Sequence, residues 1–229
     1  MWLTSAETSA LWLSVSVATR SVIFSLPLAI GFAWLLTRRQ FAGRTLLDAV
    51  VHLPLVLPPV VVGYLLLLLF GTRGLIGAAL HRNFGIVLVF TRNGAALATA
   101  VMSFPLMVRA MRLSLETVDR GLEDAARTLG AGTLDRFATI TLPLMLPGIL
   151  AGAVTAFSAA LGEFGAVITF VSNVPGETRT LPLALYTALQ TPGGDGAASR
   201  LAGLAVLLGL SGLLLSEWLA RRVRRSLGR

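Results

Sequence analysis

The side chains most suited to chemistry lie in a polar stretch, Asp119 to Pro147, that separates long apolar segments. Four apolar residues in it recur at the spacing of one helical face: Leu122, Ala125, Ala126 and Leu129. Glu123 precedes Arg127 by four positions, the order that favours an ion pair along a helix. An apolar stripe beside a charged pair can hold another protein in register, so we interpret the stretch as a docking surface. The alternative is a helical hairpin that rests on lipid headgroups.

Residues that begin and end helices divide this stretch into two short helices. Asp119 is a good N-cap for the first helix, and Gly130 can adopt the left-handed conformation that ends it. Thr133 is then expected to cap a second helix over residues 134–141. The sequence therefore predicts two helices that meet at a glycine-rich elbow.

Patterns for catalysis or cofactor binding are missing from the sequence. The chain has no Cys, and His52 and His81 are isolated rather than spaced as metal ligands. It also lacks the pattern G-x-x-x-x-G-K-[ST], so it cannot cradle the phosphates of ATP. We therefore expect no enzyme activity, no cofactor and no metal in this chain. Any ATP, with its Mg²⁺, would be bound by a separate subunit.

The composition indicates a membrane protein. Of the 229 residues, 55% are apolar and 13% are charged, and the mean hydropathy is +0.80. Soluble domains carry about a quarter charged residues. The basic side chains are all Arg, 19 against 11 acids, and they gather at the ends of apolar segments, where they orient membrane helices. We therefore expect a lipid bilayer as a partner and no nucleic acid.

Five apolar segments are long enough to cross a bilayer as helices. We predict an all-α, polytopic membrane protein that forms a single transmembrane domain over residues 1–229. It has a polar loop at 112–143 and spans at residues 11–36, 46–70, 86–108, 144–171 and 201–219. Splitting the 144–171 segment would give six spans, the alternative topology. The N-terminus lacks the pattern of a signal peptide, so the first segment is expected to remain as a span.

Several positions interrupt these segments. Pro58 and Pro59, with Pro54 before them, must break the second span, and in lipid a broken helix survives only against protein or a water-filled cavity. We expect the break to face the bundle interior, a plain kink being the alternative. Residues 71–84 read as a polar connection, and residues 91–94 interrupt the third span, whose helical core is expected from Ala95. Residues 181–189 predict a short amphipathic helix.

Two charged residues lie inside apolar segments. Arg20 is expected to reach the outer interface, and the alternatives are an anion contact in the interior or a pair with an acid on another span. Glu163 is expected to be structural and to pair with an Arg, because a carboxylate is a poor ligand for an anion. A proton carrier is the rival role for Glu163.

Arginine counts predict the orientation. Thirteen arginines lie in residues 37–45, 109–136 and the C-terminal tail, whereas five lie in the alternate connections. Cytoplasmic loops carry the excess of basic residues, so we expect the polar loop and the C-terminus in the cytoplasm and the N-terminus outside. The expected location is a bacterial-type inner membrane.

The polar loop also resembles a known family. Glu123-Asp124-Ala125-Ala126, followed by Gly130 and by Ile140-Thr141-Leu142-Pro143, resembles the E-A-A signature of permease subunits of binding-protein-dependent ABC importers, with Asp124 as an extra residue between Glu and the Ala pair. The resemblance implies that this loop is the coupling helix that docks on an ATPase subunit. It implies a coupling site made of Glu123, Asp124, Ala125, Ala126, Arg127, Leu129 and Gly130.

The resemblance covers nearly the whole chain. Residues 52–64, 102–109, 161–166 and 172–180 are similar to permease subunits of molybdate importers, and the Pro-Gly-Glu-Thr-Arg-Thr stretch at 175–180 favours molybdate over the related sulfate permeases. It implies a type I ABC importer fold and partners that include an ATPase subunit, a periplasmic oxyanion-binding protein and a second copy of this chain. Sulfate, thiosulfate or tungstate are the alternative substrates. A proton-coupled secondary transporter and a non-transporting membrane anchor are the alternative classes.

Candidate residues for the transport pathway come from the interrupted segments. They are Pro58, Pro59, Gly63, Ser103, Phe104, Glu163, Phe164 and Gly165.

Overall fold

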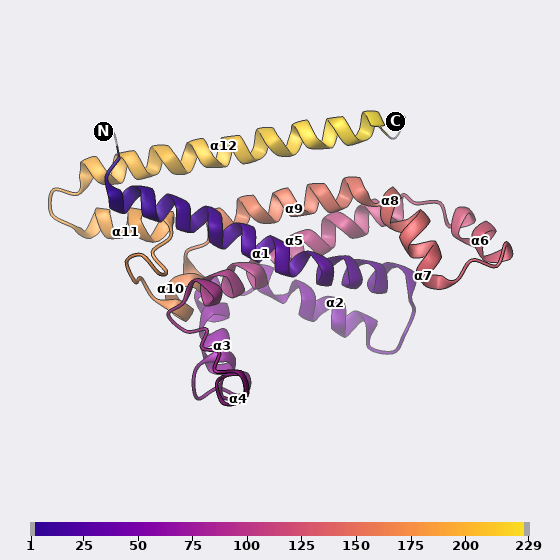
Figure 1. Ribbon diagram of the computed structural model, residues 1–229, viewed down its shortest axis with the longest axis horizontal. Helices are drawn as coiled ribbons and strands as arrows, with labels where there is room; N and C mark the ends of the chain where they lie inside the picture. The colour runs from indigo at the N-terminus through magenta and orange to yellow at the C-terminus, as the bar shows by residue number, and fades with distance from the viewer. Residues whose placement is uncertain (1–2, 227–229) are drawn as a thin grey trace.

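The computed structural model describes residues 3–226, and in the last helix it describes side chains only as far as residue 218, without those at 213, 216, 217. All regular structure in this range is helical, as the sequence predicts. Four helices lie along the long axis of the molecule (Figure 1): α1 (Ser5–Arg38), α5 (Arg92–Glu116), α9 (Leu146–Leu161) and α12 (Asp195–Ser226).

The centre of the bundle is formed by α1, α5 and α9, and α12 packs on α9. Small residues let these helices approach closely, which is the usual basis of helix packing in membranes. Ala29 and Ala33 of α1 are fully buried, and a Cβ on Gly152 of α9 would lie 3.2 Å from the Met107 carbonyl oxygen of α5. Two apolar clusters result, one around α3, α10 and the first half of α5, the other around the second halves of α1 and α5.

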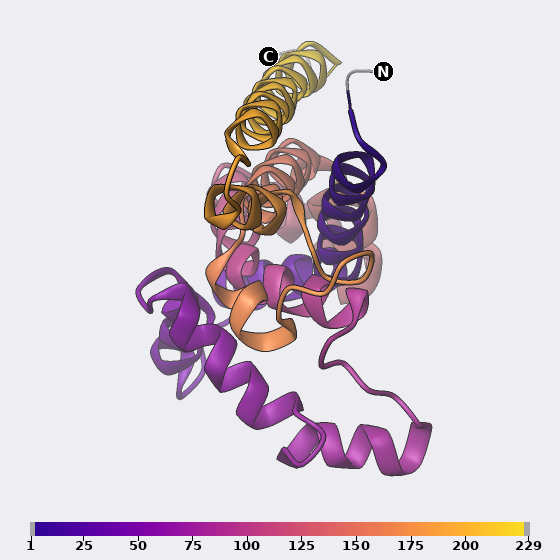
Figure 2. The same ribbon diagram turned by 90° about the vertical axis from the view of Figure 1, so that its left-hand side faces the viewer.

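The second predicted span consists of two helices and not one. Helix α2 (Arg44–His52) continues into a 3₁₀ turn at Leu53–Leu55, and α3 (Pro59–Phe70) leaves at 114° to that direction. Pro58 has an extended backbone and cannot continue the helix, whereas Pro59 fits the first turn of α3. Residues 75–84 were expected to be a polar connection, but they form helix α4 (Leu75–Phe84). Figure 2 shows α3 and α4 extending away from the bundle.

The third predicted span has different bounds. Residues 86–91 are not helical, and α5 begins at Arg92 and continues beyond residue 108 as far as Glu116. The Thr91 hydroxyl accepts a hydrogen bond from the Gly94 amide at 3.1 Å and thereby caps the helix. The polar residues 91–94, which were interpreted as an interruption, are the start of the helix.

The fourth predicted span is also divided. Helix α9 ends at Leu161, and α10 (Gly165–Val171) begins after a break at residues 162–164. Before α9 lie α6 (Arg120–Thr128), α7 (Thr133–Arg136), a π-helical turn (Phe137–Thr141) and α8 (Leu142–Leu144), and the chain bends by 65° between α8 and α9. The helix predicted at 181–189 is confirmed as α11 (Leu181–Gln190), in which Leu181 and Leu183 are buried and Leu189 is exposed.

Among the described residues, α1 and α5 are each long and apolar enough to cross a membrane. The bent pairs 44–55 with 59–70 and 133–144 with 146–161 could each supply one more span. The predicted span at 201–219 lies inside α12 and stays a prediction, and the arginine side chains of the C-terminal tail lie outside the described residues.

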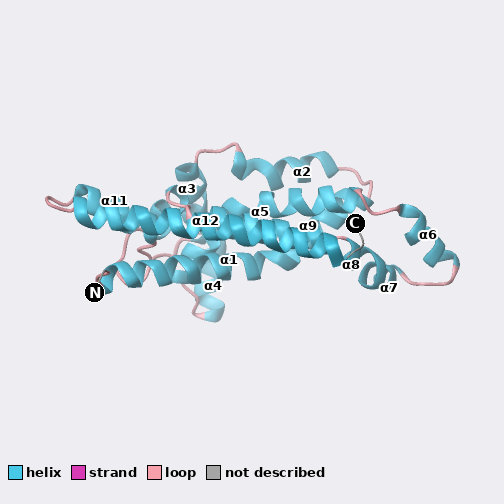
Figure 3. Cartoon of the chain, turned by 90° about the horizontal axis from the view of Figure 1, so that it is seen from above, coloured by secondary structure: helices cyan, strands magenta, loops and turns pink. Residues whose placement is uncertain are grey.

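The connections with many arginines lie at one end of the molecule. Figures 1 and 3 place α6, α7, the α1–α2 connection and the last turns of α12 at this end, and the N-terminus and α11 at the other. The two groups of connections that the arginine count separates are therefore separated in space as well.

Candidate functional site

Helix α6 has the ends that its sequence predicts. The Asp119 carboxylate accepts a hydrogen bond from the Gly121 amide at 2.8 Å, which caps the N-terminus. At the other end Gly130 has a φ of +88°, and the amides of Gly130 and Ala131 bind the carbonyl oxygens of Arg127 and Ala126 at 3.1 and 3.0 Å. This pair of bonds is a Schellman cap, in which glycine meets no steric penalty.

The second helix of the elbow differs from the prediction at its start. Gly132 is the N-cap residue and makes no side-chain capping bond, and Thr133 is already helical. The Thr133 hydroxyl instead accepts a hydrogen bond from Arg136 at 3.3 Å. The prediction that Thr133 caps this helix is therefore wrong, because its hydroxyl accepts from the Arg136 side chain and not from a free backbone amide.

Glu123 makes its contacts inside the protein. Its Oε1 lies 3.2 Å from Nη2 of Arg38 on α1 and accepts a hydrogen bond from the Thr141 hydroxyl at 2.7 Å. The predicted ion pair between Glu123 and Arg127 is therefore wrong, and Arg127 pairs with Asp124 at 3.4 Å. Arg38 lies far away in the sequence, so no local spacing could reveal it as the partner.

Arg38 and Thr141 are the structural residues that sequence reasoning missed at this site. The Arg38 side chain is only 8% exposed, and its Nη2 also donates to the Val118 carbonyl oxygen at 3.3 Å. The Thr141 side chain is buried at the end of the π-helical turn. Through these two contacts Glu123 joins α6 both to α1 and to the segment that leads into α9.

The two faces of α6 point in opposite directions. Its charged residues line a pocket of about 300 Å³ that also contains Trp34, Arg38, Arg39 and Arg136; we call it the basic pocket. On the opposite face, the predicted apolar stripe is open to solvent: Leu122 is 49% and Leu129 87% exposed. Because Glu123 turns inward and the leucines turn outward, α6 leaves apolar surface uncovered in the single chain.

Five of the predicted pathway residues lie together where α3 crosses α10: Pro59, Gly63, Glu163, Phe164 and Gly165. A Cβ on Gly63 would lie 2.7 Å from the Ala166 carbonyl oxygen, and one on Gly165 would lie 2.8 Å from Cβ of Pro59. The backbones of the two helices therefore touch. Pro58, just before α3, is exposed.

Glu163 has a structural role different from the one predicted. Its Oε1 accepts a hydrogen bond from the Ala166 amide at 2.9 Å and caps α10, and among the described residues no Arg pairs with it. The Phe164 ring packs against Tyr186 of α11, with the ring centroids 5.1 Å apart. The expected pair of Glu163 with an Arg is therefore wrong, because the free amides at the start of α10 are nearer.

Ser103 and Phe104 lie away from the α3–α10 crossing. The Ser103 side chain is buried, and its hydroxyl donates to the Thr99 carbonyl oxygen of the same helix at 2.8 Å. The Phe104 ring meets the edge of Phe32 on α1, with centroids 5.6 Å apart, and lines an apolar groove of about 440 Å³ between α1, α2 and α5. The structure thus divides the predicted pathway residues between two places.

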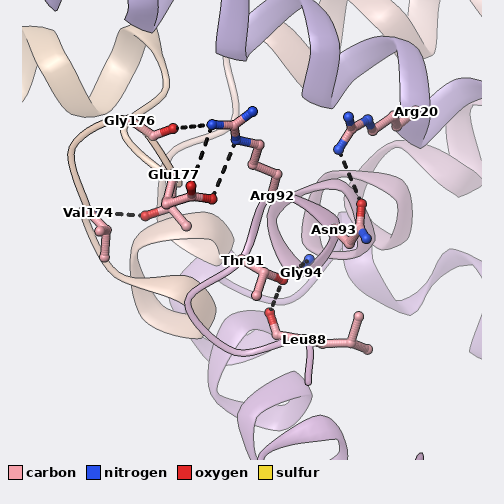
Figure 4. A network of polar contacts seen from close by, with 10 residues as sticks. Arg20, Leu88, Thr91, Arg92, Asn93, Gly94, Val174, Gly176 and Glu177 are labelled. Carbon is pink, nitrogen blue, oxygen red and sulfur yellow. Dashed lines mark hydrogen bonds and ion pairs between the residues drawn. The ribbon is translucent and has the colours of Figure 1, made fainter. Parts of the chain in front are cut away.

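At the end opposite to α6, polar contacts hold a loop onto α5 (Figure 4). Arg92 donates to the Gly176 carbonyl oxygen at 2.7 Å and pairs with Glu177 at 3.4 Å. Arg20 donates to the Asn93 side-chain oxygen at 3.2 Å. This hydrogen bond is exposed, and among the described residues no acid pairs with Arg20, so the alternative of a pair with an acid on another span is not found.

The folded chain has the features of a multi-pass permease: a bundle of long apolar helices and an exposed apolar stripe on a loop at one end. The chain belongs to the family described as binding-protein-dependent transport system inner membrane component, whose model matches residues 25–225. Members of this family are the membrane components of ABC importers, not the ATPases. The chain is therefore a multi-pass inner-membrane permease component, and its family implies an ATPase and a binding protein as partners.

Relatives include the molybdenum transport system permease protein ModB of Escherichia coli K12, 61% identical over 100% of both chains. ModB of Haemophilus influenzae is 57% identical over 97% of both chains. The sulfate transport system permease protein CysT of Salmonella typhimurium is 39% identical over 83% of this chain and 70% of its own length.

Solved structures show the same fold. The bacterial alginate ABC transporter in complex with a pentasaccharide-bound periplasmic protein superposes with a TM-score of 0.75 at 19% identity, over 96% of this chain and 80% of its own. The MetNI methionine ABC transporter superposes with a TM-score of 0.73 at 17% identity, over 96% of this chain and 99% of its own. The predicted ABC importer permease fold is confirmed.

Proposed function

We propose that this chain is the permease subunit of an ATP-driven importer of molybdate. The sequence is 57–61% identical, over nearly the full length, to permeases named for molybdenum transport, and 39% identical to a sulfate permease. This difference supports molybdate over sulfate as the substrate. Tungstate remains the closest chemical alternative, since it is also a tetrahedral oxyanion. The chain supplies the membrane pathway, and ATP with its Mg²⁺ is bound by the partner ATPase.

The exposed stripe of α6 is the observation that carries the coupling role. In the stripe, Leu122, Ala125 and Leu129 are exposed in the single chain and Ala126 is half-buried, and burial of such a surface against an ATPase subunit would be favourable. Asp124 and Arg127 lie on the opposite, charged face of α6, and Gly130 ends α6 at the elbow that leads into α7. The proposed coupling site is the one that the family resemblance implies.

Glu123 has a transmitting role in this proposal. Because its carboxylate holds both Arg38 of α1 and Thr141 before α9, a displacement of α6 acts on two helices of the central bundle at once. Rigid-body movement of such helices opens one side of a membrane pathway while it closes the other. The break at residues 162–164 and the α3–α10 crossing are the proposed moving part of that pathway.

The proposed assembly contains two copies of this chain, two ATPase subunits and a periplasmic oxyanion-binding protein. A symmetric pair would place the pathway on the two-fold axis. We propose that the N-terminus lies outside and that α6 and the C-terminus lie in the cytoplasm, in agreement with the arginine count. In that orientation α6 is on the side of the membrane where ATP is found.

Reconstitution in liposomes with the ATPase and the binding protein tests this function. Labelled molybdate should enter only with ATP, and tungstate should compete more strongly than sulfate. Leu122→Glu should reduce both ATPase binding and uptake at least about tenfold, because it buries a carboxylate in an apolar contact. Thr117→Glu adds the same charge off the stripe and serves as the control.

Other outcomes identify the rival functions. A preference for sulfate would make the chain a sulfate permease. Uptake by the chain alone, driven by a proton gradient, would favour a secondary transporter. ATPase binding without uptake of any oxyanion would favour a membrane anchor.

A further inference from the structure

The basic pocket between α6 and the end of α1 carries charge that the protein leaves unneutralised. Five arginines and two carboxylates line it. Arg38 pairs with Glu123, and Arg127 pairs with Asp124, so the two carboxylates are already used. Three arginines remain, and among the described residues no carboxylate pairs with any of them: Arg39, Arg120 and Arg136.

A buried donor in the pocket also lacks a partner. Nε of Arg38 is buried and makes no hydrogen bond within the described part of the chain, although the rest of this guanidinium is bound. A buried N–H without a partner costs free energy, so native proteins satisfy such donors with a ligand or water. Nε of Arg38 is closed off from solvent, so the pocket offers an anionic oxygen the positive charge of its other arginines.

An apolar groove of about 360 Å³ adjoins the basic pocket. The two share Trp34, Thr133 and Phe137, and the Trp34 and Phe137 rings meet edge to face with centroids 5.9 Å apart. Leu134, at the rim of the groove, is 80% exposed. On α1, a Cβ added to Gly31 would meet no atom within 4 Å, so the groove is empty along that helix.

The surroundings match the boundary of a bilayer. Trp34 lies near the end of the first predicted span, and the guanidinium of Arg39 sits over its ring at 5.3 Å from the centroid. Trp is enriched where the hydrocarbon meets the headgroups, and basic pockets at that level bind anionic headgroups. A molecule with an anionic head and an apolar tail could therefore place its head in the basic pocket and its tail in the apolar groove, on the two sides of Trp34.

We propose that this composite site binds an anionic phospholipid of the phosphatidylglycerol type, with its phosphate in the basic pocket and one acyl chain in the groove along Gly31 and Leu134. The lipid would meet the charged face of α6, whereas the apolar stripe of α6 lies on the opposite face. A lipid in the basic pocket therefore leaves the apolar stripe of the coupling site free for the ATPase. The lipid stabilises the position of α6 against α1.

Native mass spectrometry of the purified full chain, without ATPase, tests lipid selectivity. We expect phosphatidylglycerol to bind more tightly than phosphatidylcholine. Arg39→Gln with Arg120→Gln should weaken phosphatidylglycerol binding about 30-fold, the effect expected for two arginines at a membrane surface. Arg73→Gln with Arg82→Gln removes the same charge elsewhere and should leave binding within about twofold. Equal losses in both double variants would overturn the proposal.

A substitution in the groove distinguishes a loss of lipid binding from a loss of protein stability. Gly31→Leu fills open space, and Leu is a better helix former than Gly, so the variant should unfold at the same or a higher temperature. It should nevertheless bind phosphatidylglycerol at least about fivefold more weakly, because its side chain occupies the position of the acyl chain. Gly31→Ala, which adds only a methyl group, is the matched control. Unchanged binding in Gly31→Leu would refute the groove as the site of the acyl chain.

Fluorescence quenching locates the lipid and excludes other ligands. In a variant that keeps Trp34 alone, with the other three tryptophans replaced by Phe, brominated phosphatidylglycerol should quench more than brominated phosphatidylcholine. Inorganic phosphate and molybdate should not relieve this quenching beyond the effect of chloride at equal ionic strength. Relief by these ions would make the pocket a site for soluble oxyanions. Relief by the ATPase subunit would make it part of the coupling interface, and either result overturns the lipid site without affecting the proposed transport function.

Discussion

The contact between Glu123 and Arg38 offers the sharpest test of how α6 is held. Glu123→Gln keeps the shape of the side chain and its ability to accept the Thr141 hydroxyl, but removes the charge that faces Arg38. The pair is largely shielded, since the Arg38 side chain is 8% and the Glu123 side chain 19% exposed. Loss of one partner of a fully buried pair costs about 3–5 kcal/mol, and a charged hydrogen bond about 1.5–3 kcal/mol. Because water can reach Glu123, we expect a cost of about 2 kcal/mol.

Hydrogen exchange can measure this cost. Helix α6 has nine residues, and an isolated helix of that length is marginal in water, so its amides stay protected only while it is docked. A loss of about 2 kcal/mol should raise the exchange rate of the α6 amides about 30-fold. Amides in the middle of α5 should not change.

Asp124→Asn is the matched control, because it removes the same charge one residue later. Its pair with Arg127 joins side chains that are 62% and 66% exposed, and such surface pairs contribute at most about 1 kcal/mol. Exchange in α6 should therefore change by less than about fivefold. If Glu123→Gln has no greater effect than Asp124→Asn, the ion pair does not hold α6 and the transmitting role of Glu123 is wrong. Arg38→Gln should cost less in the Glu123→Gln background than in the unchanged chain.

Two further variants test the packing of the remaining elements. Gly63→Ala should lower the thermal unfolding temperature in detergent, because its methyl would lie 2.7 Å from the Ala166 carbonyl oxygen. Overpacking of this kind costs about 1–3 kcal/mol. The control Gly203→Ala meets no atom within 4 Å and should not lower the unfolding temperature. Equal unfolding temperatures would show that α3 and α10 can separate without loss of stability. Arg200→Gln should destabilise the chain by about 2 kcal/mol, because it leaves the Glu7 carboxylate, 5% exposed, without its partner at 2.8 Å; Glu7→Gln in the same chain should recover part of the loss.

Local features of the chain could be predicted from the sequence. The cap at Asp119, the left-handed Gly130 and the helix over residues 181–189 each depend on residues within one or two turns of one another. The break before Pro59 follows from the chemistry of proline alone. The family could be recognised for the same reason, because its signature is a short local pattern.

Errors arose where a local pattern competed with contacts between distant segments. Residues 91–94 look like an interruption in an apolar segment, yet Thr91 caps α5 and Arg92 fastens the loop at Gly176. Glu123 and Arg127 have the spacing of a helical ion pair, but Arg38 provides a better-shielded partner for Glu123. In both cases the contacts come from residues that the local spacing does not reveal.

The sequence alone determined that this chain is an all-helical membrane protein with a polar loop between apolar segments, because hydrophobic length and helix capping are properties of contiguous residues. Its E-A-A signature, also a local pattern, indicated the permease family. Only the tertiary structure decided which way α6 faces. Glu123 turns inward because its carboxylate pairs with Arg38, brought from α1, and the leucines on the opposite face consequently point to solvent. The sequence shows the apolar stripe, but the direction of that stripe depends on a contact between residues 38 and 123.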